Sequence, residues 1–178
     1  MPDRQVDILV VDDNPSDVQL MLYVLKNHGL GDRVQVAMDG AEALEFLFCT
    51  GRYSERNIQN QPKVILLDLK LPLVDGLEML RRIKSDARTR AVPVVVVTSS
   101  RAERDICESY ELGVNSYIVK PIDFQEFSES VKSLSTYWLR LNQPPLLPDS
   151  FLQERRRNGG SGNEVHASQS VEDEEALT

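Results

Sequence analysis

The sequence has few cysteines and no long apolar run. Its 178 residues include two cysteines, Cys49 and Cys107, which lie far apart and form no Cys-x-x-Cys pair or Cys/His cluster. Neither a disulfide framework nor a zinc site is therefore expected. No stretch approaches the roughly 20 apolar residues of a membrane-spanning helix, and the first residues lack the apolar core of a signal peptide. We expect a cytoplasmic protein with no membrane partner.

The chain also lacks an excess of basic residues. It has 28 Asp and Glu against 20 Lys and Arg, which gives a formal net charge of −8. Because proteins that bind nucleic acid need basic surface against the phosphates, this balance disfavours a nucleic-acid partner. The length suits one ordinary domain with an appendage.

The appendage begins after a proline-rich segment at 144–148. Residues 149–178 carry seven acidic and three basic residues together with a run rich in Gly and Asn at 158–163. Such a segment buries too little apolar area to offset the entropy of ordering, so we predict a folded domain over 1–148 and a disordered acidic tail over 149–178. The tail has no helix-turn-helix spacing, and no DNA-binding output domain is expected there.

Short apolar runs alternate with helical patterns within the predicted domain. The runs are rich in β-branched residues and lie at 8–11, 34–36, 64–67, 94–97 and 117–119. Runs this apolar are typical of strands covered on both faces, as in a parallel sheet. Asp39, Asp75 and Asp123 each precede a Glu by three residues, which is the pattern of a helix start. The sequence thus predicts an α/β fold, a (βα)₅ three-layer sandwich.

Chemically active side chains directly follow four of the five predicted strands. Asp12 and Asp13 follow the first strand, Asp68 the third, Thr98 the fourth and Lys120 the fifth. Ligands bind outside the carboxyl ends of the strands in an open parallel sheet, so these groups should converge. Clustered carboxylates repel one another unless a cation neutralises them. Mg²⁺ is the expected cofactor, because it takes one or two carboxylates together with a phosphoryl oxygen.

This set of groups predicts phosphoryl chemistry on Asp68. A carboxylate can attack phosphorus and form an aspartyl phosphate. Lys120 would place a positive charge against the phosphoryl oxygens, and the Thr98 hydroxyl would donate a hydrogen bond that exists only once the phosphoryl group is present. Such a difference between two states is what a switch requires.

At these positions the sequence resembles the receiver domain of two-component response regulators. The matching motifs, in chain order, are DD at 12–13, LLDLKLPLVDG at 66–76, VTS at 97–99 and KP at 120–121. The likeness covers about residues 6–142. It implies the flavodoxin-like fold, with a parallel five-stranded sheet of order 2-1-3-4-5.

The resemblance also implies a role for each matched residue. Asp68 would be the phosphoacceptor. The group that holds Mg²⁺ would be Asp12, Asp13, Asp68 and the backbone carbonyl of Lys70. The residues that contact the phosphoryl group or switch with it would be Thr98, Lys120 and Tyr117. The peptide bond between Lys120 and Pro121 is expected to be cis.

By this resemblance the protein would be a single-domain response regulator in a phosphorelay. It would take a phosphoryl group from a sensor histidine kinase and change the face made by the fourth helix, fifth strand and fifth helix, for partner binding or homodimer formation. The polar extension at 50–61, the segment 109–117 and the Tyr-Trp-Leu at 137–139 are similar to stand-alone receivers paired with bacterial and cyanobacterial phytochromes. A phytochrome is therefore the expected kinase.

Two other classes share part of the pattern. A haloacid-dehalogenase-like phosphatase also uses an Asp nucleophile with Mg²⁺, but its second Asp, two residues after the nucleophile, is replaced here by Lys70. We therefore expect no enzyme, and at most slow self-dephosphorylation. The alternative is a receiver-like binding module that acts without phosphorylation, in which the carboxylates or the lysine are usually lost. The kinase, the target, the oligomeric state, the lifetime of the phosphoryl group and the role of the tail stay open.

Overall fold

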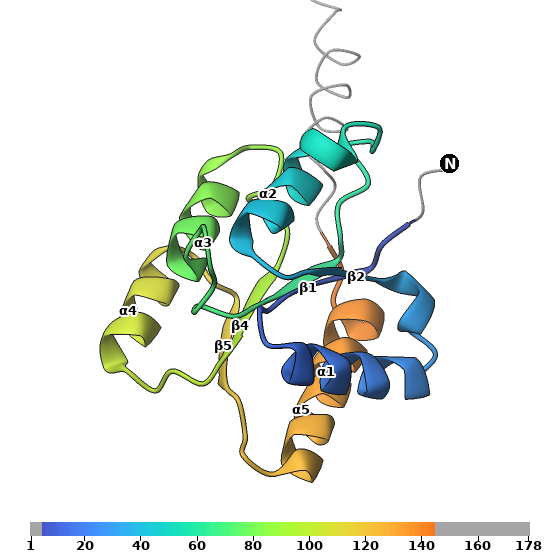
Figure 1. Cartoon of the computed structure of the whole chain (residues 1–178), viewed down its shortest axis with the longest axis vertical. Coiled ribbons are helices and arrows are strands. Elements are labelled where there is room, and N and C mark those ends of the chain that lie inside the picture. The colour runs from blue at the N-terminus through green and yellow to red at the C-terminus, as the bar shows by residue number, and fades with distance from the viewer. Residues whose placement is uncertain (1–4, 145–178) are drawn as a thin grey trace, which may run out of the picture. The chain divides into compact units, whose positions relative to one another are not determined.

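The computed structural model describes residues 5–144, which form one parallel five-stranded sheet with helices on both faces (Figure 1). The strand order is β2-β1-β3-β4-β5, so the predicted flavodoxin-like (βα)₅ architecture is confirmed. The strands are β1 (Ile8–Val11), β2 (Val34–Ala37), β3 (Val64–Leu67), β4 (Val94–Thr98) and β5 (Ser116–Val119). The predicted tail over 149–178 and its boundary at 148 lie outside the described residues.

Within residues 5–144, four α-helices and two short helical turns connect the strands, and a fifth helix and a third turn follow β5. The helices are α1 (Pro15–Asn27), α2 (Gly40–Phe48), α3 (Gly76–Ser85), α4 (Glu103–Glu111) and α5 (Phe124–Thr136). The turns are η1 (Gly31–Arg33), η2 (Gly51–Tyr53) and the π-helical η3 (Tyr137–Leu141). No helix in the described part of the chain is long and apolar enough to cross a membrane.

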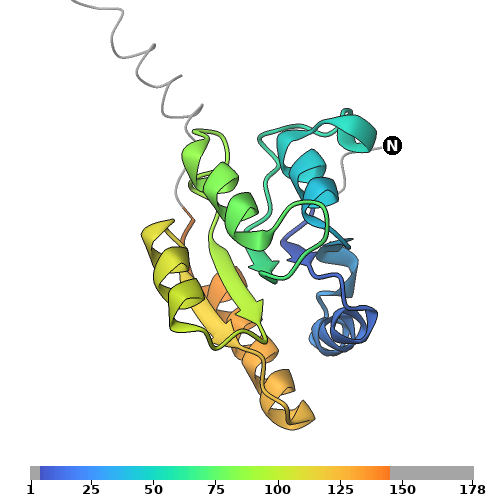
Figure 2. The ribbon, with the colours of Figure 1, turned by 60° about the vertical axis from the view of Figure 1, so that its left-hand side comes forward.

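The helices cover the sheet on both of its faces (Figure 2). The strands alternate their side chains between two apolar layers, one under each set of helices. In β1, Leu9 and Val11 pack into the layer formed with α2 and α3, whereas Ile8 and Val10 pack into the layer formed with α1 and α5. Because both faces of β1 are covered, every one of its residues is buried. This explains why the sequence of β1 is one continuous apolar run.

The helix starts follow the caps that the sequence predicts. The Asp39 carboxylate accepts a hydrogen bond from the Glu42 backbone N–H, and Asp75 and Asp123 cap α3 and α5 in the same manner. Asn14 caps α1, because its side chain accepts from the backbone N–H of Ser16. These caps fix where α1, α2, α3 and α5 begin. Helix α4, with Ala102 at its N-cap, has no side-chain cap.

Gly76 seats α3 against the end of β3. A Cβ atom at this position would lie 2.4 Å from the Asp68 carbonyl oxygen and 2.5 Å from the Leu69 Cα atom. Both neighbours are backbone atoms, which cannot rotate away, so no side chain fits here. The close approach holds the loop that follows Asp68 against the helix.

Replacing Gly76 with alanine should therefore destabilise the fold. We expect Gly76→Ala to lower the free energy of unfolding by about 2 kcal/mol, as overpacking at a tight contact does, measured by urea denaturation. Gly31→Ala is the matched control, because its Cβ would lie 3.2 Å from the Lys26 Cβ and Cγ atoms, which need to move by only a few tenths of an ångström, and its stability should change less than that of Gly76→Ala. Equal stability of Gly76→Ala and the wild type would show that the loop moves without cost.

Candidate functional site

Two of the predicted carboxylates, Asp12 and Asp68, meet at the ammonium group of Lys120, together with Asp17. Its Nζ atom donates hydrogen bonds to Asp12 Oδ2 at 2.8 Å, Asp68 Oδ2 at 2.7 Å and Asp17 Oδ2 at 2.8 Å. The side chain of Lys120 is 10% exposed, and those of Asp12 and Asp68 are 1% and 8% exposed. A nearly buried charge cluster therefore lies at the carboxyl ends of the strands.

The sheet register brings these residues together. Val11 of β1 is level with Leu67 of β3, so that Asp12 and Asp68 leave adjacent strands at the same height. The Asp68 backbone N–H donates to the Val11 carbonyl at 2.9 Å. The Lys120 N–H donates to the Thr98 carbonyl at 2.8 Å, so β5 delivers the lysine to the same edge.

Both carboxylate oxygens of Asp68 have partners. Oδ2 accepts from Lys120, whereas Oδ1 accepts from the Thr98 hydroxyl at 2.7 Å and from the Lys70 backbone N–H at 3.2 Å. The predicted hydrogen bond from Thr98 to a phosphoryl group stays a prediction. Because the end of β4 lies beside the end of β3, the Thr98 hydroxyl donates to Asp68 in this structure. A Thr98 switch would have to exchange one acceptor for another.

Burial and charge act in opposite directions on the ionisation of the cluster. Burial raises the pKa of Asp12, and the hydrogen bonds from Lys120 and from the Asn14 N–H only partly offset this effect. Burial lowers the pKa of Lys120, but its hydrogen bonds to Asp12, Asp17 and Asp68 outweigh burial and raise the pKa above the usual lysine range. The lysine therefore stays charged at neutral pH.

The donor chemistry at this edge fits a hard divalent cation. Asp12 and Asp68 offer carboxylate oxygens, and Mg²⁺ prefers oxygen ligands and typically takes one or two carboxylates. The three carboxylates and one ammonium of the cluster leave an excess of negative charge. Such an excess favours a bound cation.

Asp13 is not among the three acceptors of the Lys120 ammonium. Its side chain is exposed, and residues 5–144 contain no group of three His, Cys, Asp or Glu side chains arranged to hold a metal ion. The expected convergence of Asp12, Asp13 and Asp68 is thus not formed in advance. Lys120 instead donates to one oxygen of Asp12 and to one oxygen of Asp68.

Asp17 is the residue of the cluster that sequence reasoning missed. It lies in the first turn of α1, where an acidic residue is already explained by the helix dipole. Its contact with Lys120 spans 103 residues of sequence, so no local motif reveals it.

Ser100 connects the site to α4 and to Tyr117 of β5. The Tyr117 hydroxyl donates to the Ser100 carbonyl at 3.2 Å, and burial raises the pKa of Tyr117. The Ser100 hydroxyl donates to Asp105 in the first turn of α4 at 2.5 Å, and the Ser100 N–H donates to the Thr98 hydroxyl oxygen at 3.4 Å. A continuous hydrogen-bonded path thus runs from Asp68 through Thr98 to α4.

The peptide bond between Lys120 and Pro121 is trans, because no cis peptide bond occurs in the described residues. The expected cis bond is therefore not present. Trans is the lower-energy isomer of an X–Pro bond by about 0.5–1 kcal/mol unless tertiary contacts favour cis. In the trans form Lys120 already reaches all of its carboxylate partners.

Comparison with known proteins identifies the class of this site. Residues 8–132 match the family model of the response regulator receiver domain. The chain belongs to this family.

Two proteins of known name are similar to this chain in sequence. The chain is 38% identical over 138 residues to the probable methanogenesis regulatory protein FilR2 of Methanothrix harundinacea. The aligned region covers 78% of this chain and 86% of FilR2. It is also 37% identical over 132 residues to response regulator Rcp1 of Synechocystis sp.. This alignment covers 74% of this chain and 88% of Rcp1.

The same likeness holds in three dimensions. The structure of the phosphorylated cyanobacterial phytochrome response regulator RcpA superposes with a TM-score of 0.72 at 38% identity, covering 78% of this chain and 96% of RcpA. The Mn(2+)-bound form of Rcp1 superposes with a TM-score of 0.72 at 36% identity, covering 78% of this chain and 97% of that chain. This receiver is thus close to phytochrome response regulators.

The cluster also yields a stability prediction. Lys120→Met leaves the carboxylates of Asp12 and Asp68 buried without their cation, so we expect the free energy of unfolding to fall by about 3 kcal/mol at pH 7. The loss should shrink at acidic pH. Burial already raises the pKa of Asp12, and protonation of this carboxyl removes the unpaired charge.

Chemical denaturation at neutral and acidic pH measures this difference. The exposed Lys132 of α5 provides the control Lys132→Met, which should change stability by less than about 0.5 kcal/mol at either pH. A loss for Lys120→Met that is the same at both pH values would contradict the electrostatic explanation.

Proposed function

We propose that this protein is a phosphorylation-switched response regulator that accepts a phosphoryl group on Asp68 from a phosphohistidine of a sensor histidine kinase. The observation that carries the proposal is the placement of Asp68 between the Lys120 ammonium on one oxygen and the Thr98 hydroxyl on the other. Membership in the receiver family supports this role.

The chemistry of the step follows from these contacts. A carboxylate oxygen of Asp68 attacks phosphorus, an O–P bond forms, the P–N bond to the donor imidazole breaks, and the imidazole leaves with the bonding electron pair and takes a proton. The Lys120 ammonium already contacts Asp68 Oδ2. Its positive charge would therefore stabilise negative charge on a phosphoryl group bound to Asp68. Thr98 donates a directional hydrogen bond from the other side.

Mg²⁺ is the proposed cofactor, held by Asp12, Asp68, the exposed Asp13 and the backbone carbonyl of Lys70. When bound, it supplies positive charge that neutralises the carboxylates and the phosphoryl oxygens. The acidic oxygen donors of Asp12 and Asp68 support this assignment, as does the Mn(2+)-bound structure of the similar protein Rcp1.

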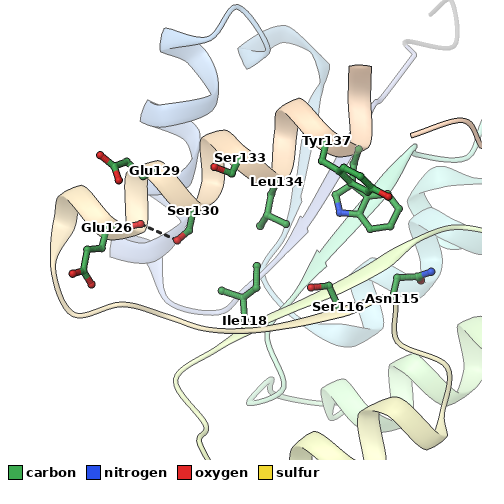
Figure 3. A pocket seen from close by; sticks show the side chains of 10 residues that line it. Asn115, Ser116, Ile118, Glu126, Glu129, Ser130, Ser133, Leu134 and Tyr137 are labelled. Atoms are coloured by element: carbon green, nitrogen blue, oxygen red, sulfur yellow. Dashed lines mark hydrogen bonds between the residues drawn. The ribbon is translucent and has the colours of Figure 1, made fainter. Parts of the chain in front are cut away.

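The proposed output is a change in the face formed by α4, β5 and α5. The path from Thr98 through Ser100 to Asp105 and Tyr117 links the site to this face. The face also carries a groove of about 780 Å³ between β5 and α5, into which Ile118 and Leu134 point (Figure 3). A partner protein or a second copy of the chain would bind this face.

A phytochrome is the proposed kinase, because Rcp1 and RcpA are similar to this chain and RcpA is a phytochrome response regulator. The kinase supplies the phosphoryl group, so the protein itself is proposed to be no enzyme beyond slow self-dephosphorylation. Its regulatory action would come from the two states of Asp68.

Phosphorylation is tested by intact mass after incubation with acetyl phosphate. We expect the wild type to gain one phosphoryl group only when Mg²⁺ is present, and Asp68→Asn to gain none, because it lacks the attacking carboxylate. Asp75→Asn is the matched control: asparagine keeps the cap of α3, and this variant should be labelled like the wild type. No labelling of the wild type by acetyl phosphate or by a phosphohistidine kinase would favour a binding module that acts without phosphorylation.

The metal assignment has its own test. Mg²⁺ should raise the melting temperature of the wild type by mass action, since it binds the folded state. Asp13→Asn should reduce this rise, and because Asp13 is exposed the variant should fold normally. Glu103→Gln in the first turn of α4 removes a similar surface charge and should keep the full rise. An unchanged rise for Asp13→Asn would place Asp13 outside the metal site.

A further inference from the structure

The Lys120 ammonium has three N–H donors, and each has a carboxylate acceptor. Asp12, Asp68 and Asp17 accept these bonds at 2.7–2.8 Å. Asp12 and Asp68 belong to the proposed phosphoryl and metal site. Asp17 has no part in that chemistry, yet its contact with Lys120 is as short as the contact of Asp12.

The start of α1 holds Asp17 in place. Pro15 is the first residue of the helix, and the Asn14 side chain accepts from the Ser16 N–H at 3.0 Å, so the backbone at position 17 is set by a proline and a cap. The Asp17 side chain is 30% exposed, against 1% for Asp12. It is therefore the most solvent-accessible of the three carboxylates.

Two of the three acceptors change during the proposed reaction. Phosphorylation converts the Asp68 carboxylate into an acyl phosphate, and a cation bound to Asp12 and Asp68 would compete with the ammonium for the same oxygens. Lysine carries its charge on a flexible four-carbon stem and moves when its partners change. The Asp17 contact is the one that neither event removes.

We propose that Asp17 is a positioning residue that keeps the Lys120 ammonium beside Asp68 in both states of the switch. The inference rests on the proposed function. Asp17 touches neither the phosphoryl group nor Asp68; it acts through the hydrogen bond to Lys120. An acidic residue in a first helical turn also interacts favourably with the helix dipole, so the test has to separate the two effects.

Three variants make this separation. Asp17→Asn removes the charged acceptor, and Asp17→Glu restores a carboxylate at the same position. The double variant Ser16→Asp with Asp17→Asn returns the negative charge to the first turn but not to the side facing Lys120, because neighbouring helical residues point in different directions. Ser16 is exposed, so the new carboxylate costs no burial.

The first readout is the ¹H–¹⁵N signal of the Lys120 ammonium without any phosphodonor, assigned by its loss in Lys120→Gln. Hydrogen bonds to carboxylates slow the exchange of these protons with water. We expect the signal to weaken or vanish in Asp17→Asn and in the double variant, and to return in Asp17→Glu. The second readout, the rate of labelling by acetyl phosphate with Mg²⁺, should fall roughly three- to tenfold in the first two variants.

A wild-type signal and rate in Asp17→Asn would overturn the proposal, as would their recovery in the double variant. The readouts also separate this inference from the proposed function. If the wild type takes no phosphoryl group from any donor, the proposed function fails, while the ammonium signal still decides whether Asp17 holds Lys120. Unchanged melting temperatures of the variants would show that loss of fold does not cause the effect.

Discussion

The hydrogen bonds from the Lys120 ammonium to three carboxylates are the interaction on which the site depends. Asp12 and Asp68 are almost buried, and charges buried in this way are costly unless they are paired. The parallel register places both carboxylates at one height, and β5 delivers the cation between them. Because each partner leaves a different element, the ion cluster also ties β1, β3, β5 and the first turn of α1 together at one edge of the sheet.

The surroundings of the three carboxylates differ, and the differences single out Asp68. Asp12 is the most buried, and one of its oxygens accepts from the Asn14 N–H. Asp17 is the most exposed and receives no hydrogen bond from a threonine hydroxyl or a strand-end amide in the described residues. Asp68 has the lysine on one oxygen and Thr98 on the other, so donors flank the position at which negative charge would develop. Thr98 in turn connects this carboxylate to Ser100 and α4.

The sequence predicted the sheet and most of the site because both follow from patterns along the chain. Apolar runs locate the strands, and parallel strands place their next residues at one edge, which brings Asp12, Asp68, Thr98 and Lys120 together. What the sequence could not predict depends on three-dimensional detail. The contact between Asp17 and Lys120 joins residues far apart in the sequence. The hydrogen bond from Thr98 to Asp68 depends on how close the two strand ends lie. The trans isomer of the peptide bond before Pro121 depends on a small energy difference.

Of the three carboxylates around Lys120, we propose that Asp68 receives the phosphoryl group. Borohydride reduces an acyl phosphate to an alcohol, so treating the phosphorylated protein and sequencing its peptides by mass spectrometry marks the modified residue. We predict homoserine at position 68, with Asp12 and Asp17 unchanged. Homoserine at position 12 or 17, with aspartate intact at 68, would show that Asp68 is not the phosphoacceptor.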